Sequence, residues 1–354
     1  MNKIKVGIIG FGLSGKVFHA PMINSMDFME ISKIVTTNPV SAREAKKIYP
    51  HAQIVSNPNE IFEDDEIDLV IVSVPNTFHV DLASKALMAN KHVVVEKPFT
   101  ITSKDAEELI TLSQERHRLL SVYQNRRWDS DFLTVKKIME SNMLGNVVEF
   151  ESHYDRFSDF VNPNAWREAN IPGSGMLYDL GSHLIDQALC LFGLPKEVNG
   201  DIRIQRKDGK VDDYFEINLF YDNTKVILKS SMLVREPLLR FIILGDKGSY
   251  VKYGMDVQED ALKVGLIPTD PKNWGVEPEE SWGILNTEIN KLHFRGKVES
   301  ERGNYRAFYE NLSKAIKGEE ELMVKPEEAR NTIRVIEHVI LSNKSKCNVK
   351  FSQV

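Results

Sequence analysis

A six-residue segment near the start of the chain, Gly10-Phe11-Gly12-Leu13-Ser14-Gly15, follows a short β-branched run, Lys5 to Ile9, and precedes a helical pattern. This glycine spacing between a strand and a helix is typical of a loop that binds the pyrophosphate of a dinucleotide. Gly10 permits the tight turn, Gly12 lets the backbone approach the phosphates, and Gly15 lets the helix pack closely against the sheet. The alternative is that the glycines serve only the loop itself. We predict that all six residues contact a dinucleotide whose phosphates lie on the N–H groups at the helix start.

Four further β-branched runs alternate with helical patterns in the first 123 residues. Unbroken apolar strands separated by helices are typical of a parallel sheet that is covered on both faces. Residues 1–123 are therefore predicted to form a doubly wound α/β domain, a Rossmann fold that binds NAD or NADP. The expected strands are Ile31 to Thr36, Leu69 to Val74, His92 to Glu96 and Leu119 to Tyr123, and the expected helices are Ser41 to Tyr49 and Ser103 to Arg116, the latter with Ser103 as N-cap.

The remaining residues, 124–354, are rich in short strands joined by turn signals such as Asp208-Gly209 and Asp222-Asn223. They indicate an α+β domain with a large, mostly antiparallel sheet and helices on one face. Residues 255–300 are expected to be irregular. Because a broad sheet with one uncovered face commonly packs against its own copy, we expect this domain to bind substrate and to form a homodimer or homotetramer.

Composition narrows the class of partner. The 354 residues include 45 Lys and Arg against 51 Asp and Glu, a net charge of −6, and 42% of them are hydrophobic. An acidic chain without a long basic run argues against nucleic acid or an anionic membrane, so a small molecule is the expected partner. The two cysteines, Cys190 and Cys347, have no partner at metal-ligand spacing, and no apolar run is long enough to span a bilayer. A cytoplasmic location is expected.

The end of the second strand indicates which dinucleotide is used. An Asp or Glu there would bond the ribose hydroxyls and repel a 2′-phosphate, but this chain has Thr36, Thr37 and Asn38, followed by Arg43 and Lys46 on the next helix. Neutral donors with a cation in reach suit the doubly charged phosphate of NADP, so NADP is preferred and NAD remains possible. In the alternative interpretation, Arg43 and Lys46 form a solvated helix face.

Three side chains are candidates for proton chemistry. Lys97 follows the valine run of the fourth expected strand, at the carboxyl edge where open α/β sheets bind ligands, and Pro98 restricts it to an extended conformation. Asp179 and His183 are four residues apart on a helix that follows a glycine-rich turn. The alternatives are a solvated lysine, a capping aspartate and a core histidine. His183 with Asp186 lacks a third ligand at convincing spacing, so no metal site is predicted.

The motifs together resemble the Gfo/Idh/MocA oxidoreductases, the family of glucose-fructose oxidoreductase and inositol dehydrogenase. The resemblance covers nearly the whole chain and includes the glycine loop, Val74-Pro75-Asn76-Thr77-Phe78-His79, Glu96-Lys97-Pro98, and Gly173-Ser174-Gly175 leading into Asp179-Leu180-Gly181-Ser182-His183. Three further stretches look most like the NADP-linked scyllo-inositol dehydrogenase branch: Phe18-His19-Ala20-Pro21, Asn125-Arg126-Arg127-Trp128-Asp129 and Ala165-Trp166-Arg167-Glu168.

The resemblance implies hydride transfer between a secondary alcohol of a polyol, inositol or sugar and the cofactor. It makes Lys97, Asp179 and His183 the catalytic set. His183, whose ordinary pKa is about 6.5, would take the hydroxyl proton, and Lys97 would stabilise alkoxide character. The implied substrate contacts are Lys97, Tyr154, Trp166, Asp179 and His183. The cofactor contacts expected outside the glycine loop are Thr36, Thr37, Asn38, Arg43, Ser73, Pro75, Asn76, His79, Glu96, Lys97, Asn125, Arg127, Trp166 and Arg167.

Two other functions remain open at this point. One is NAD-dependent glycoside hydrolysis within the same family, in which the cofactor is oxidised and reduced without net turnover. The other is a dinucleotide-sensing regulator that performs no chemistry. Lys97, Asp179 and His183 argue against the regulator, because a sensor has no need of a proton-transfer set.

Overall fold

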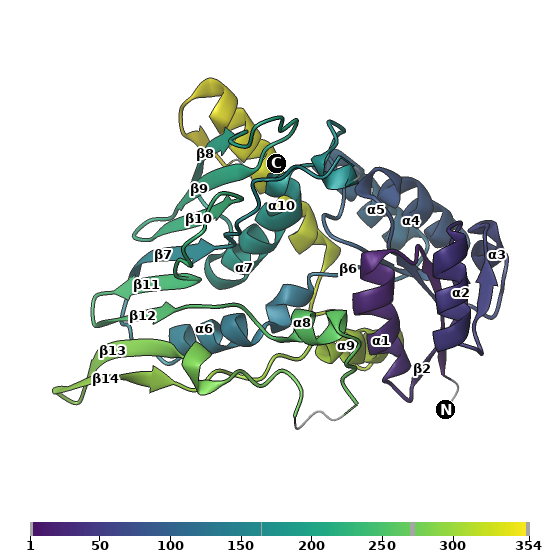
Figure 1. Ribbon diagram of the computed structural model, residues 1–354, viewed down its shortest axis with the longest axis horizontal. Helices are drawn as coiled ribbons and strands as arrows, with labels where there is room; N and C mark the ends of the chain where they lie inside the picture. Colours follow the sequence, from purple (N-terminus) through teal and green to yellow (C-terminus); the bar gives the residue numbers. More distant parts are fainter. Residues whose placement is uncertain (1–2, 164, 270–272, 352–354) are drawn as a thin grey trace. The chain divides into compact units, whose positions relative to one another are not determined.

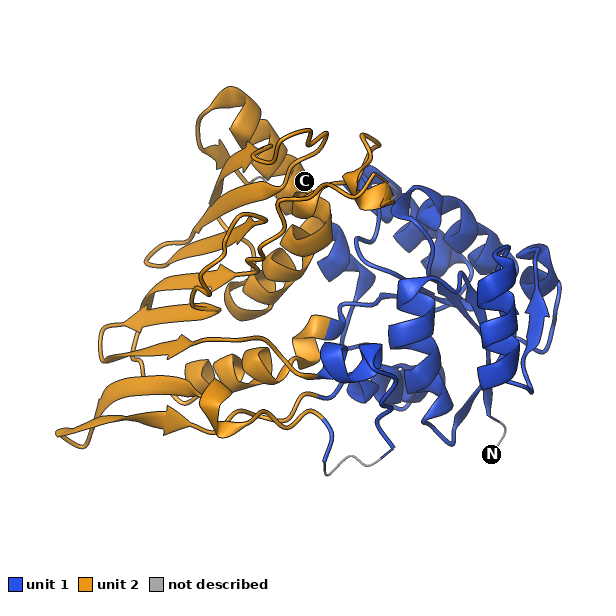
Figure 2. Ribbon diagram, viewed as in Figure 1, with its two compact units in different colours: residues 1–125, 258–274, 304–330 blue, residues 126–257, 275–303, 331–354 orange. Residues whose placement is uncertain are grey.

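A computed structural model describes residues 3–163, 165–269 and 273–351. The chain forms two compact units (Figure 2): unit 1 comprises residues 1–125, 258–274 and 304–330, and unit 2 comprises residues 126–257, 275–303 and 331–354. The chain first passes from unit 1 to unit 2 after Asn125, close to the boundary expected after Tyr123. Residues 258–274 and 304–330 differ from the expected division because they return to unit 1. Aromatic packing explains one return, since Phe308 and Tyr309 lie 5.0 and 5.8 Å from the Tyr123 ring.

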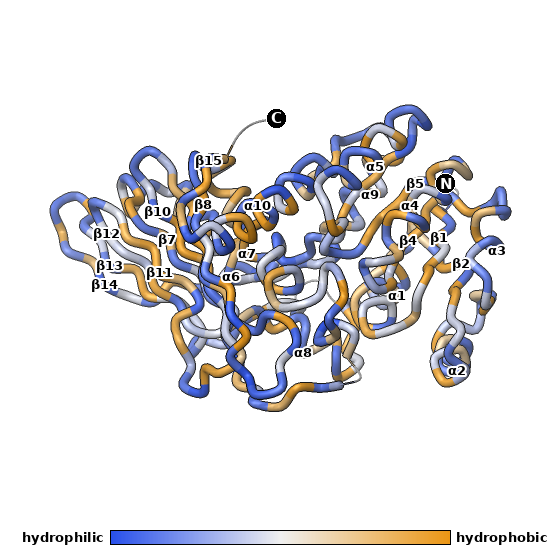
Figure 3. Tube along the Cα trace, turned by 90° about the horizontal axis from the view of Figure 1, so that it is seen from above, coloured by the Kyte–Doolittle hydropathy of each residue, from blue (hydrophilic) through white to orange (hydrophobic). Residues whose placement is uncertain are grey.

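Unit 1 is built on a six-stranded parallel sheet in the order β3-β2-β1-β4-β5-β6. The strands are apolar because both faces are covered, and β4 is hydrophobic throughout (Figure 3). The strand order reverses between β1 and β4, and ligands of open α/β sheets bind outside the carboxyl ends at such a point. The strands are β1 (Ile4–Ile9), β2 (Met29–Val35), β3 (Gln53–Val55), β4 (Leu69–Val72), β5 (His92–Val95) and β6 (Leu120–Val122).

The helices of unit 1 connect these strands, and two segments from later in the chain join them. Helix α4 packs on β5 and α5, and α1 packs on β2. The helical elements are the π-helical turn η1 (Gly15–His19), α1 (Ala20–Asn24), α2 (Pro39–Ile48), α3 (Asn59–Phe62), η2 (Asn76–Phe78), α4 (His79–Met88), α5 (Ser103–Glu115), α8 (Gln258–Lys263) and α9 (Arg306–Ile316).

Unit 2 is built on a nine-stranded sheet in the order β14-β13-β12-β11-β7-β10-β9-β8-β15. Only the β7–β10 pair is parallel among the described strand pairs of this sheet. Helices α6, α7 and α10 lie along one face (Figure 1). The strands are β7 (Val147–His153), β8 (Glu197–Arg203), β9 (Tyr214–Phe220), β10 (Lys225–Ser231), β11 (Phe241–Gly245), β12 (Gly248–Lys252), β13 (Gly283–Ile289), β14 (Leu292–Val298) and β15 (Val349–Lys350). The helical elements are α6 (Ser130–Glu140), η4 (Trp166–Glu168), η5 (Leu177–Gly181), α7 (Ser182–Phe192), η6 (Glu279–Ser281) and α10 (Pro326–Ser345), with η3 (Asn125–Trp128) where the chain enters the unit. Residues 326–330 at the start of α10 belong to unit 1.

These two sheets confirm the predicted fold class, whereas two local predictions are wrong and one strand was not predicted. Residues 255–300 are not irregular, because they contain α8 and the β13–β14 hairpin. The N-cap of α5 is Thr102 rather than Ser103, because the Thr102 hydroxyl accepts the Asp105 N–H at 3.1 Å. Strand β3 was not expected at all, since it is only three residues long. In the described part of the chain, no helix is long and apolar enough to cross a membrane.

Candidate functional site

The three glycines of the loop after β1 have different structural requirements. Gly10 has a φ of +100°, and a Cβ there would lie 2.1 Å from the Ser73 carbonyl oxygen. A Cβ on Gly15 would lie 2.3 Å from the Gly10 carbonyl oxygen, whereas a Cβ on Gly12 would meet nothing within 4 Å. The fold itself therefore requires Gly10 and Gly15. Gly12 leaves open space beside its backbone, which is the room that a pyrophosphate needs.

The other loop residues divide between the core and the surface. Phe11 is buried and packs edge-on against Tyr49, with ring centroids 6.2 Å apart, while the Leu13 side chain is exposed. The Ser14 hydroxyl donates a hydrogen bond to Glu96. Ser73 follows β4, across the switch point from the loop, and its buried hydroxyl has no hydrogen-bond partner among the described residues. This orphaned hydroxyl lies 3.5 Å from the position that a Cβ on Gly15 would take and fits a polar ligand, so the loop region suits a dinucleotide.

The segment after β2 shows which charged group is available for an adenosine phosphate. Thr36 and Thr37 follow the strand, and Asn38 caps α2 by accepting the N–H groups of Val40 and Ser41. Lys46 donates to the carbonyl oxygens of Pro50 and Ala52, at 2.9 and 3.4 Å, so its ammonium is engaged at the far end of α2. Arg43 is exposed and makes no hydrogen bond or ion pair with a residue that the structure describes. Of the two expected cations, Arg43 is the available one.

The segment after β4 is tied to the segment that carries Lys97. Asn76 is buried at the start of η2, just after Pro75, and His79 is buried at the start of α4. The His79 Nε2 lies 3.0 Å from the Val74 carbonyl oxygen, and Nδ1 lies 3.0 Å from that of Pro98. Burial lowers the His79 pKa, although the backbone hydrogen bonds act in the opposite direction. His79 therefore connects two backbone segments, and its predicted cofactor contact stays a prediction.

Glu96 and Lys97 follow β5 at the carboxyl edge of the parallel sheet. Glu96 is buried, and its Oε2 accepts the backbone N–H of Lys97 at 2.9 Å. Burial by itself would raise the Glu96 pKa, but hydrogen bonds from His19 and Ser14 and the charges of His19 and Lys97 outweigh it and lower the pKa to about 2. The carboxylate is thus ionised at neutral pH. Lys97 is half-buried, and its peptide bond to Pro98 is cis.

In unit 2, the glycine-rich turn begins the helix that carries Asp179. Gly175 has a φ of +90°, and a Cβ there would lie 2.1 Å from Asp212 Oδ1. The Asp212 carboxylate accepts the N–H of Leu177 at 2.7 Å and so caps the π-helical turn η5. Asp179 lies in this turn, and its Oδ1 accepts Arg167 Nε at 3.2 Å. The Arg167 guanidinium stacks 4.7 Å from the neighbouring Trp166 ring, so the structure brings Trp166, Arg167 and Asp179 together.

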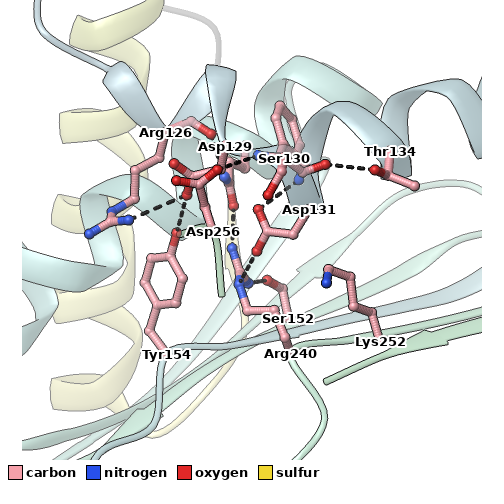
Figure 4. A network of polar contacts seen from close by, with 12 residues as sticks. Arg126, Asp129, Ser130, Asp131, Thr134, Ser152, Tyr154, Arg240, Lys252 and Asp256 are labelled. Atoms are coloured by element: carbon pink, nitrogen blue, oxygen red, sulfur yellow. Dashed lines mark hydrogen bonds and ion pairs between the residues drawn. The ribbon is translucent and has the colours of Figure 1, made fainter. Parts of the chain in front are cut away.

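His183 lies on α7 one turn after Asp179 and is 4% exposed. Its ring meets the Tyr154 ring edge-on, with centroids 6.4 Å apart. Tyr154 is itself buried, with its hydroxyl 3.4 Å from Asp129 Oδ2 and its ring under the Arg240 guanidinium at 4.0 Å (Figure 4). Burial raises the Tyr154 pKa, so the phenol stays neutral. The Tyr154 ring packs against His183, and the predicted contact of Tyr154 with substrate stays a prediction.

Where the chain enters unit 2, Asn125 is buried and Arg127 forms an ion pair. Arg127 donates from Nε and Nη2 to the two oxygens of Asp186, at 2.8 and 2.6 Å. This bidentate pair fixes α7 three residues beyond His183. The spacing of Asp186 from His183 suggested a metal ligand as one alternative, whereas in the structure Asp186 binds a guanidinium.

Of the predicted catalytic set, Lys97 belongs to unit 1, and Asp179 and His183 belong to one helix of unit 2. Sequence reasoning missed Asp212 and the partnership of Arg127 with Asp186. The Asp212-Asp213 doublet before β9 was a usable signal for Asp212, because two adjacent carboxylates at a strand start need partners. Nothing in the sequence links Arg127 to Asp186, which are separated by 59 positions.

Comparisons with known proteins identify the family of this chain. The oxidoreductase-family description for an NAD-binding Rossmann fold matches residues 4–124, and that for a C-terminal alpha/beta domain matches residues 136–351. The chain is 40% identical to the scyllo-inositol 2-dehydrogenase (NADP(+)) IolW of Bacillus subtilis over 98% of this chain and 95% of that protein.

Two solved structures are similar over the full length. The oxidoreductase yvaA of B. subtilis has a TM-score of 0.95 and 39% identity and covers 99% of both chains. An oxidoreductase of Bacteroides fragilis has a TM-score of 0.90 and 45% identity and covers 99% of this chain and 100% of that chain. With a glycine loop that suits a dinucleotide and both family domains present, the chain belongs to the Gfo/Idh/MocA oxidoreductase family and is an NAD(P)-dependent dehydrogenase.

Proposed function

We propose that the protein uses NADP to interconvert a secondary alcohol of scyllo-inositol, or of a related polyol or sugar, with the corresponding ketone. The observation that carries this proposal is the similarity along nearly the whole chain to an enzyme named as an NADP-linked scyllo-inositol dehydrogenase. The preference for NADP rests also on the adenosine end of the site. No carboxylate follows β2, and the exposed Arg43 is available to a 2′-phosphate.

The chemistry assigns a role to each residue of the proposed set. The bound nicotinamide supplies the hydride acceptor or donor. His183 takes the proton that leaves the alcohol oxygen, and Lys97 donates a hydrogen bond to that oxygen as alkoxide character develops. Asp179, held by Arg167, orients a neighbouring hydroxyl or the imidazole.

The direct experiment is a panel of inositols and aldoses, each offered with NADP and with NAD, with reduced nicotinamide followed by absorbance. We expect stoichiometric NADPH with at least one inositol. Turnover of a glycoside without accumulation of reduced cofactor would instead establish the recycling hydrolase. Cofactor binding with no turnover of any alcohol or glycoside would favour the regulator.

A matched pair of variants tests the cofactor preference. Arg43→Gln removes the available cation, whereas Lys46→Gln removes a cation that already binds the carbonyl oxygens of Pro50 and Ala52 on the same helix. Loss of one charge-assisted hydrogen bond should raise the KM for NADP about tenfold in Arg43→Gln and leave the KM for NAD nearly unchanged. Equal effects of the two variants on NADP would contradict the role of Arg43.

A further inference from the structure

His19 is a fully buried polar side chain that the proposed mechanism does not use. It ends the π-helical turn η1, which begins at Gly15 of the phosphate loop. In this turn the N–H of Ala20 donates to the carbonyl oxygen of Gly15, five residues back. π-helical turns are rare and occur frequently at functional sites, so the side chain at the end of this one needs an explanation.

Both ring nitrogens of His19 have partners. Nδ1 lies 2.5 Å from the Tyr309 hydroxyl, and Nε2 lies 2.9 Å from Glu96 Oε1. The ring also packs against Tyr123, with centroids 4.4 Å apart. Tyr309 comes from α9, 290 positions away in the sequence, and its hydroxyl is buried. The contact therefore joins the last segment of unit 1 to its first helix.

The chemistry of the groups fixes the direction of the hydrogen bond between His19 and Glu96. Glu96 is an ionised carboxylate and can only accept, so the proton on Nε2 of His19 is donated to it. Burial raises the Tyr309 pKa well above its ordinary value, so the phenol keeps its proton. The Tyr309 hydroxyl and Nδ1 of His19 share a hydrogen bond at 2.5 Å. The relay runs from Tyr309 through His19 to Glu96 with every group satisfied.

The end of this relay is attached to both halves of the cofactor site in unit 1. Glu96 Oε1 also accepts the Ser14 hydroxyl from the phosphate loop, and Oε2 accepts the backbone N–H of Lys97. His79 holds the backbone on the other side of Lys97 through the carbonyl oxygen of Pro98. The orientation of one carboxylate therefore sets the position of the loop serine and of the lysine backbone together.

We propose that His19 and Tyr309 are positioning residues of the dehydrogenase, which fix the Glu96 carboxylate and through it align Lys97 with the phosphate loop. The inference rests on the proposed role of Lys97 in turnover. It goes beyond that role because it makes α9, near the end of the chain, part of the apparatus that sets the rate. Neither residue touches the reacting atoms, so both act through Glu96.

Tyr309→Phe is the mildest test, because it removes only the hydroxyl that begins the relay. Ser121→Ala is its matched control. The Ser121 hydroxyl is buried and donates to the Val324 carbonyl oxygen at 2.9 Å, so it also ties residues 304–330 to the sheet, without contact to Glu96. Both variants should lower the melting temperature by a similar amount, since each loses one buried hydrogen bond.

We expect Tyr309→Phe to lower kcat for the polyol about tenfold, the equivalent of one hydrogen bond, with KM for the polyol nearly unchanged. It should also raise the Kd for NADPH, measured by fluorescence titration, whereas Ser121→Ala should change neither quantity. His19→Ala should lose more activity and regain part of it when imidazole is added to fill the space of the missing ring.

Equal kcat and equal NADPH affinity in Tyr309→Phe and Ser121→Ala would overturn the proposal and leave the relay as a tie between α9 and the sheet. The cofactor titration separates this failure from failure of the proposed function. If the wild-type protein binds NADPH but oxidises no polyol, the proposed function is wrong. The proposed positioning role of His19 and Tyr309 is then tested by NADPH affinity alone, which must fall in Tyr309→Phe and not in Ser121→Ala.

Discussion

The loop glycines permit a test that separates cofactor binding from folding. Gly12→Ala adds a methyl group where no atom lies within 4 Å, whereas Gly15→Ala places one 2.3 Å from the Gly10 carbonyl oxygen. An ordinary contact at this position needs about 3.4 Å, so Gly15→Ala must displace the loop backbone by roughly 1 Å. We expect the free energy of unfolding to change by less than about 1 kcal/mol in Gly12→Ala and to fall by about 2–4 kcal/mol in Gly15→Ala.

In Gly12→Ala, the affinity for the cofactor should fall strongly although the stability hardly changes. The added methyl group occupies the space expected for the pyrophosphate and costs one or two charge-assisted hydrogen bonds to backbone N–H groups, so the Kd for NADPH should rise about 10- to 100-fold. Urea unfolding gives the stability of each variant, and quenching of NADPH fluorescence gives the Kd. A Gly12→Ala protein that is stable and binds NADPH as tightly as the wild type would refute the placement of the phosphates beside Gly12.

Three further predictions follow from charged groups. Burial raises the pKa of Asp212 to about 6, so the folded protein binds more protons than the unfolded chain between about pH 4 and 6. Stability should therefore fall by up to about 3 kcal/mol as pH rises through this window, and urea titrations of Asp212→Asn should lack that component. Arg127→Leu should cost about 3–5 kcal/mol in urea unfolding because it leaves the Asp186 carboxylate buried, and the double variant with Asp186→Leu should recover most of this loss. Lys97→Ala should lower kcat about 100-fold while the Kd for NADPH changes little; full turnover in that variant would remove the assignment of Lys97.

The elements that were predictable from the sequence are those whose signal is local. Strands β1, β4 and β5 are apolar runs, and the loop between Gly10 and Gly15 carries its geometry in its spacing. Strand β3 has only three residues, too few to show a periodicity. The solvent-exposed positions of β13 and β14 include both apolar and polar residues. Lys46 and Arg43 look equivalent in the sequence, and only the fold of α2 turns one toward backbone carbonyl oxygens.

The site residues show the same limit. Asp179, His183 and Lys97 were predicted because their residue types and neighbours are informative. The contacts that hold this segment in place were not predicted, because the partners are distant in the sequence. Arg167 lies 12 positions from Asp179, and Asp212 lies 35 positions from Leu177. The return of residues 304–330 to unit 1 was likewise not predictable from the sequence, since it depends on a contact between Tyr309 and His19, which are 290 positions apart.

The helix start after the phosphate loop and the helix start that carries Asp179 share one structural feature. The helix after the phosphate loop and the helix that carries Asp179 each contain a π-helical turn, η1 and η5. The first begins at Gly15 and the second begins two residues after Gly175, and a side chain would clash at either glycine. Such turns are rare in proteins, so we infer that other contacts hold them. His19 holds the first through Glu96 and Tyr309, and Asp212 holds the second through the N–H of Leu177. In each unit, a polar group outside the proposed catalytic set thus holds the helix start that carries predicted site residues.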